Sequence, residues 1–148
     1  MNLFLQGGEV ATEDAAPQRA DVWIVDGTIK AVGVMDVPEG ARVVDCAGKI
    51  VMPAMFDAHV HFREPGQEHK ETILDGTEAA INGGITGVVM MPNTAPSIDS
   101  PTVVNRVLEI GKKCRIPVLT SGCITVGRKG DEMAAIAGMK KAGVLMLT

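Results

Sequence analysis

The stretch PAMFDAHVHFREPG, Pro53–Gly66, places polar and apolar residues at alternate positions. One set is Asp57, His59, His61 and Arg63, and the set between them is Phe56, Ala58, Val60 and Phe62. Successive side chains of an extended strand point to opposite faces. The pattern therefore predicts a strand that carries an acid, two imidazoles and a guanidinium on one face.

Strands and helices alternate in the prediction after this stretch. Apolar runs predict strands at 85–92, 116–124 and 143–147, and helical spacing of apolar residues predicts helices over 71–84, 101–113 and 131–143. Ser100 is expected to cap the second helix, Pro101 to occupy its first position, and Asp131 to open the third. The run 85–92 is typical of a strand covered on both faces. This order predicts an α/β fold with a parallel sheet.

The parallel sheet is compatible with an open sheet or with a closed barrel. Three strand–helix units and one further strand follow Ile50, whereas a complete eight-unit barrel takes about 250 residues. On the barrel interpretation the chain is half of one, and its fourth strand leaves an apolar edge without a partner. On the other interpretation the sheet is open and complete.

The first fifty residues predict short strands joined by tight turns. Asp26 and Gly27 separate two β-rich runs in VWIVDGTIKAVG, Val22–Gly33, and this is the usual signal of a two-residue hairpin. We expect this part to form a small β-layer.

The composition indicates a globular protein and excludes several classes of function. The 148 residues are 46% hydrophobic, carry a net charge of −4 and are 3% aromatic, so no nucleic-acid partner is expected. No apolar run is long enough for a membrane span, and the first residues lack the pattern of a signal peptide, so we expect a cytoplasmic protein. The three cysteines, which are far apart, are interpreted as free, buried thiols.

His59 and His61 are candidate metal ligands. Two neighbouring histidines can also form hydrogen bonds without a metal. Their position at the end of the first strand of a βα series favours a site, because parallel α/β folds place their chemistry there. If the two imidazoles are buried, a divalent cation would satisfy them, and zinc suits neutral imidazole nitrogen. Further ligands must come from elsewhere in the fold.

Arg63 and Asn93 are candidate substrate contacts. Arg63 can bind a carboxylate through paired hydrogen bonds, or it can form an ion pair with Glu64, Glu68 or Asp57. Asn93 lies in the turn after the next strand, where its amide can reach the same ligand, although a simple turn asparagine is the alternative. Asp57 is interpreted as bonding to backbone or supporting a ligand.

Together these residues resemble the dihydroorotase family of the amidohydrolase superfamily. The resemblance is carried by GKIVMPAMFD (48–57), DAHVHFREPGQEHKE (57–71) and DGTEAAINGGITGVVMMPNT (75–94). The first motif also suits allantoinases and dihydropyrimidinases, whereas Arg63 joined with Met-Pro-Asn-Thr favours dihydroorotase. The family commonly has Gly where this chain has Ala54.

The resemblance implies a hydrolase that uses one or two Zn²⁺ ions to convert dihydroorotate reversibly to N-carbamoyl-aspartate in pyrimidine biosynthesis. It implies that His59 and His61 are zinc ligands and that Arg63 and Asn93 bind the substrate carboxylate. It also implies a small β-sandwich segment at 1–50 and, at 51–148, the N-terminal half of a TIM-like (β/α)8 barrel that stops after its fourth strand.

The family's remaining metal ligands and its catalytic aspartate lie beyond the matched region, so no catalytic residue is expected within this chain. A non-catalytic, dihydroorotase-like partner of aspartate carbamoyltransferase is therefore the rival hypothesis. Allantoinase or hydantoinase activity is the alternative among enzymes. A homo-oligomer is the expected state of association.

Overall fold

The computed structural model of the chain describes residues 1–13 and 15–148, which form two compact units, Met1–Pro53 and Ala54–Thr148. The first unit holds the strands β1 (Asn2–Thr12), β2 (Ala15–Val25), β3 (Thr28–Gly33), β4 (Arg42–Asp45) and β5 (Ile50–Val51). The second holds β6 (Met55–Val60), α1 (Ile73–Asn82), β7 (Ile85–Met90), α2 (Pro101–Gly111), β8 (Val118–Gly122), a 3₁₀ turn (Val126–Arg128), α3 (Ile136–Ala142) and β9 (Met146–Leu147).

The first unit is one five-stranded sheet. Its order is β3-β2-β1-β4, and β5 pairs with β1 farther along that strand. The predicted hairpin is confirmed, because β2 and β3 pair antiparallel across Asp26 and Gly27, which both have positive φ. The β-sandwich is not confirmed, since the described residues of this unit lie in a single sheet.

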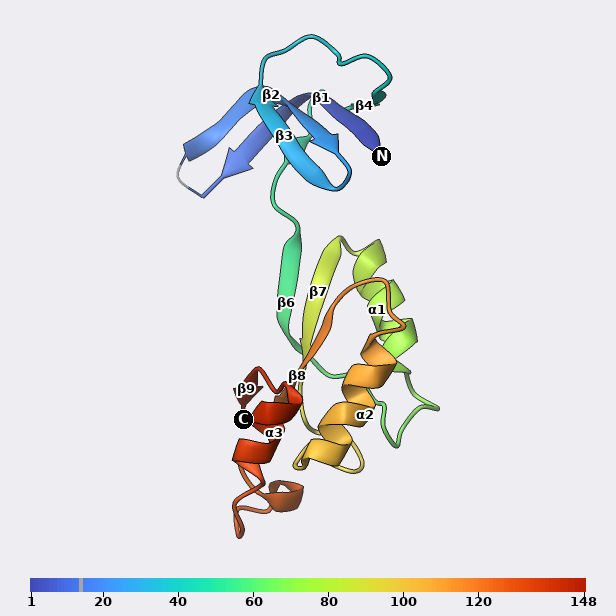
Figure 1. Cartoon of the computed structure of the whole chain (residues 1–148), viewed down its shortest axis with the longest axis vertical. Helices are drawn as coiled ribbons and strands as arrows, with labels where there is room; N and C mark the ends of the chain where they lie inside the picture. The colour runs from blue at the N-terminus through green and yellow to red at the C-terminus, as the bar shows by residue number, and fades with distance from the viewer. Residues whose placement is uncertain (14) are drawn as a thin grey trace. The chain divides into compact units, whose positions relative to one another are not determined.

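The second unit is a four-stranded parallel sheet covered by helices. The strand order is β6-β7-β8-β9, and every neighbouring pair is parallel, as predicted (Figure 1). α1 packs against β7 and α2 against β8, and α2 also contacts both α1 and α3. The helices thus form one layer. The core lies between this layer and the sheet, and Val88, Val89 and Met90 of β7 are fully buried.

Local sequence explains where the helices begin. The hydroxyl of Thr72 accepts a hydrogen bond from the Asp75 N–H at 3.1 Å and so caps α1. α2 begins at Pro101 as predicted, but the side chain of Ser100 makes no capping hydrogen bond.

The prediction that Asp131 opens the third helix is wrong, because α3 begins at Ile136. The backbone before it forms a β-like pair instead. The Val126 N–H donates to the Glu132 carbonyl at 2.8 Å, and the Ala134 N–H donates to the Ile124 carbonyl at 2.9 Å. These bonds between two neighbouring segments of the chain hold the residues before α3 extended.

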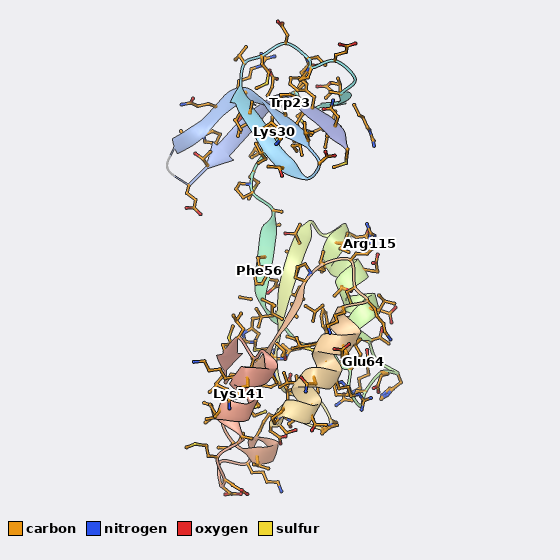
Figure 2. All side chains as sticks on the ribbon, in the orientation of Figure 1. Trp23, Lys30, Phe56, Glu64, Arg115 and Lys141 are labelled. Carbon is orange, nitrogen blue, oxygen red and sulfur yellow. The ribbon has the colours of Figure 1, made fainter. Side chains whose placement is uncertain are left out.

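The side chains of the first strand of the second unit do not separate as simple alternation predicts. Phe62 is buried in the core beside Gly76 of α1, where an added Cβ would lie 2.3 Å from its ring. Phe56, which Figure 2 labels on β6, is half exposed beside Gly87 of β7. Phe62 thus takes the buried side that alternation predicts although β6 ends at Val60, whereas Phe56, within the strand, does not. No helix among the described residues is long and apolar enough to cross a membrane.

Candidate functional site

The candidate site lies at the carboxyl ends of the parallel strands, where α/β folds commonly bind ligands. His59 is the penultimate residue of β6, and His61 is the first residue after that strand. Asn93 follows β7, which ends at Met90. These three side chains line a pocket of about 670 Å³.

The two imidazoles converge. The Nε2 atoms of His59 and His61 are 3.2 Å apart, and the ring centroids are 5.0 Å apart at an angle of 59°. Two nitrogen ligands, each 2.0–2.1 Å from a tetrahedral zinc, are separated by roughly 3.3–3.4 Å. The separation thus fits two ligands of one zinc ion, and it also fits a hydrogen bond between the rings.

Asn93 identifies the tautomer of His61. The Nδ1 atom of His61 lies 2.8 Å from the amide Oδ1 of Asn93. An amide oxygen only accepts hydrogen bonds, so Nδ1 carries the hydrogen and donates it. In the neutral ring, Nε2 then keeps a free lone pair, which is the state that a metal ligand requires.

The described residues supply an incomplete metal site. Among residues 1–13 and 15–148, no group of three His, Cys, Asp or Glu side chains is placed to hold a metal ion. His59 and His61 are exposed, because they sit at the open end of the sheet, so the condition of burial is not met. Burial of the two imidazoles therefore gives no reason to expect a bound cation. The nature of their nitrogen donors and the spacing of the Nε2 atoms are the only support for a metal ion here.

Asp57 supports the backbone of this segment, as the sequence indicates. Its Oδ1 accepts a hydrogen bond from the N–H of His59 at 2.9 Å. The carboxylate thereby fixes the chain at one of the two histidines.

Arg63 lies beyond the end of β6, so strand alternation does not fix its direction. It is half-buried, is not among the residues that line the pocket, and makes no side-chain hydrogen bond or ion pair with another described residue.

The carboxylates that were candidate partners for Arg63 have other partners. Glu64 accepts from the N–H of Ile73 at 3.0 Å, at the start of α1. Glu68 accepts from the N–H of Gly66 at 2.9 Å, and this bond lowers the pKa of its carboxyl. Its nearest cation is Arg106, at 3.7 Å. The ion pairs with Glu64, Glu68 or Asp57, which were the alternative role for Arg63, are thus absent among the described residues.

The sequence prediction missed one wall of the pocket. Arg128 and Lys129, which follow β8, line it together with the histidines and Asn93. Of the described lining residues none is Asp or Glu, so the side chains of this pocket favour an anion. The available signal was the sequence VGRKG, a pair of cations between two glycines directly after a predicted strand.

Hydrogen bonds join the loop after β8 to the loop after β7. The Gly127 N–H donates to Asp99 Oδ2 at 2.8 Å, and Arg128 Nε donates to Ser97 Oγ at 3.2 Å. Arg128 itself has a φ of 62°, a conformation uncommon outside glycine. These bonds hold the cationic wall against the loop that carries Asn93.

Comparison with known proteins gives consistent matches over the chain. The family described as dihydro-orotase-like matches residues 48–148. A dihydroorotase of Pelotomaculum thermopropionicum is 44% identical over 146 residues, which are 98% of this chain and 34% of that protein. The chain spans about a third of the length of the curated relatives it matches.

Solved structures show the same fold. An L-hydantoinase (dihydropyrimidinase) from Arthrobacter aurescens superposes with a TM-score of 0.77 at 25% identity, over 99% of this chain and 32% of that one. A dihydroorotase crystal structure has a TM-score of 0.69 at 14% identity, over 99% of this chain and 41% of the other.

Proposed function

Because the chain belongs to the dihydro-orotase-like family, we propose that it supplies the N-terminal part of a zinc-dependent dihydroorotase. The whole protein would hydrolyse (S)-dihydroorotate reversibly to N-carbamoyl-L-aspartate, a step of pyrimidine biosynthesis. The observation that carries this proposal is the convergence of two imidazole Nε2 atoms at the carboxyl end of a parallel sheet, one of them in the tautomer of a metal ligand.

Within this proposal, residues 51–148 form the first half of an eight-stranded barrel, and residues 1–50 belong to a small β-sandwich. Four parallel strands in sequence order, with the helices in one layer, support the first assignment. The first unit is a single sheet, so it supports the β-sandwich assignment only as one layer of such a sandwich.

His59 and His61 would hold the zinc ion, which activates water and polarises the substrate carbonyl when bound. The remaining ligands and the catalytic acid–base group would come from other parts of the whole protein. Arg63 and Asn93 would bind the carboxylate of dihydroorotate. The absence of a carboxylate partner for Arg63 among the described residues supports its role, because a free guanidinium can grip an anion with paired hydrogen bonds.

A second candidate activity is that of a hydantoinase, because the L-hydantoinase structure superposes well on this chain. A non-catalytic role as a partner of aspartate carbamoyltransferase is a further alternative. The retention of two converging histidines together with Arg63 and Asn93 argues against it.

The metal assignment is tested with His61→Ala in the whole protein. We expect loss of bound zinc and of dihydroorotate hydrolysis, because one of the two donors from this segment is removed. Elemental analysis measures the zinc content. His69→Ala is the matched control, since His69 is exposed and does not line the pocket, and it should leave both properties unchanged. A full zinc content in His61→Ala would refute the assignment.

The substrate assignment is tested with Arg63→Ala. Loss of two or three hydrogen bonds to a charged group is expected to weaken dihydroorotate binding by roughly 2–5 kcal/mol, with zinc retained. The control is Arg115→Ala, because the guanidinium of Arg115 pairs with Glu78 of α1 instead. Figure 2 labels Arg115. Comparable turnover of an uncharged dihydropyrimidine by the unaltered protein would favour the hydantoinase candidate.

A further inference from the structure

We infer that Asn93 is a positioning residue for His61 in addition to its proposed contact with the substrate. Its amide oxygen holds the imidazole of His61 with Nε2 free for a metal, and its amide nitrogen remains available to donate to an anion. This inference rests on the proposed function for the identity of metal and substrate, but the contact itself is a property of this chain.

The geometry of the contact is that of an ordinary strong hydrogen bond. The distance of 2.8 Å between His61 Nδ1 and Asn93 Oδ1 lies at the short end of the usual range. A neutral imidazole has two tautomers, and only the one protonated at Nδ1 presents its Nε2 lone pair. By accepting from Nδ1, the amide selects this tautomer and fixes the ring's orientation toward His59.

An amide suits both tasks better than the carboxylate that often supports a metal-bound histidine. The pocket side chains of Arg128 and Lys129 are cationic, and the described lining residues include no Asp or Glu. A carboxylate at position 93 would accept from His61 equally well, but it would repel an anionic substrate and has no hydrogen to donate. An asparagine accepts on one side and can donate on the other. The amide Nδ2 makes no hydrogen bond with a described residue.

The loop fixes Asn93 from both sides. Before it, the carbonyl of Pro92 accepts from the N–H of Ile98 at 3.1 Å. After it, the buried Thr94 donates its hydroxyl to the carbonyl of Pro96 at 2.6 Å. The backbone on both sides of Asn93 is therefore fixed within the chain itself, which supports a positioning role for its side chain.

Three variants of the whole protein separate the two roles of Asn93. Asn93→Asp keeps an oxygen acceptor and loses the donor, whereas Asn93→Leu loses both. Asn93→Ala also loses both and only removes atoms, so it replaces the Leu variant if that protein fails to fold. Asn82→Leu makes the same exchange at an exposed position at the end of α1 and serves as the control.

The first readout is the ¹⁵N NMR spectrum of the histidine rings in metal-free protein. We expect His61 to be protonated at Nδ1 in the unaltered protein, in Asn93→Asp and in Asn82→Leu, and to lose this preference in Asn93→Leu. The second readout is the zinc dissociation constant, measured by competition with a chelator. It should rise about 10–100-fold in Asn93→Leu and not rise in Asn93→Asp. Binding of dihydroorotate should weaken in both variants.

An unchanged His61 tautomer together with an unchanged zinc affinity in Asn93→Leu would overturn the inference and leave Asn93 a substrate contact alone. If the unaltered protein binds no zinc, the proposed function fails, while the tautomer measurement in metal-free protein still decides the positioning role.

Discussion

At the scale of single residues, the site depends on where one strand stops. β6 ends at Val60, so His61 and Arg63 lie outside the alternating pattern that first singled them out. His61 nevertheless meets His59, and its ring is held from the next strand's loop by Asn93. Phe62, between His61 and Arg63, enters the core. A buried phenylalanine thus anchors the segment beside the exposed imidazole.

Cysteine reactivity gives a prediction at this scale. Burial raises the pKa of the Cys123 thiol above its usual value, and the nearby Asp99 raises it further. A raised pKa leaves less thiolate at a given pH, and thiolate is the reactive form. We therefore expect iodoacetamide, at about pH 8, to modify the half-buried Cys114 before Cys123 in the folded chain.

Peptide mass spectrometry over a time course measures both modification rates. The unfolded chain is the control, in which the two cysteines should react at similar rates. Equal rates in the folded chain would show that Cys123 is neither shielded nor shifted in pKa.

At the scale of elements, contact between two loops brings the site together. The loop after β6 meets the loop after β7, where the N–H of Ala95 donates to the carbonyl of Pro65 at 3.0 Å. Gly66 has a φ of 97°, and an added Cβ would lie 1.7 Å from the Ala95 carbonyl oxygen. The close approach of these loops places Asn93 beside His61.

Gly66→Ala should therefore be strongly destabilising. We expect a loss of at least about 3 kcal/mol in the free energy of unfolding, from backbone strain and from the clash with Ala95. Gly84→Ala is the matched control, because Gly84 has a similar φ of 84° with open space around it. It should cost about 1–2 kcal/mol from strain alone.

Chemical denaturation followed by helical circular dichroism measures this difference. All helices of the described residues lie in the second unit, so their signal reports on that unit. Equal costs for the two substitutions would show that the loops can separate without loss of stability.

At the scale of the whole molecule, β9 is the last strand of the four-stranded sheet among the described residues. β9 pairs with β8 and with no other described strand, and its neighbour Leu145 and its residues Met146 and Leu147 are exposed. An apolar edge strand is a template for association with another chain. We expect the 148-residue chain by itself to associate as its concentration rises.

Leu147→Lys should reduce this association, because a charged edge residue opposes strand pairing between chains. Sedimentation velocity at several concentrations measures it. Val34→Lys is the control: Val34 is 91% exposed but belongs to the first unit and not to the sheet that contains β9. Unchanged association of Leu147→Lys would mean that another surface mediates it.

Local patterns in the sequence were enough to predict the order of elements, the parallel sheet, the hairpin at Asp26 and Gly27, and the family. A run of apolar residues, a pair of turn residues or a sequence motif indicates the same local structure whatever its tertiary contacts are. The sequence also singled out His59, His61 and Asn93, because each follows or ends a predicted strand.

The rest was decided by contacts between separate segments of the folded chain, from ten residues apart at Ile124 and Ala134 to 32 at His61 and Asn93. The late start of α3 follows from backbone bonds between Ile124 and Ala134 and their neighbours, which compete with the helix. The tautomer of His61 follows from an oxygen 32 residues away, on another loop. Arg128 and Lys129 became pocket residues through the packing of β8 beside β7. Local propensity carries no information about such partners, since they exist only once the strands are side by side.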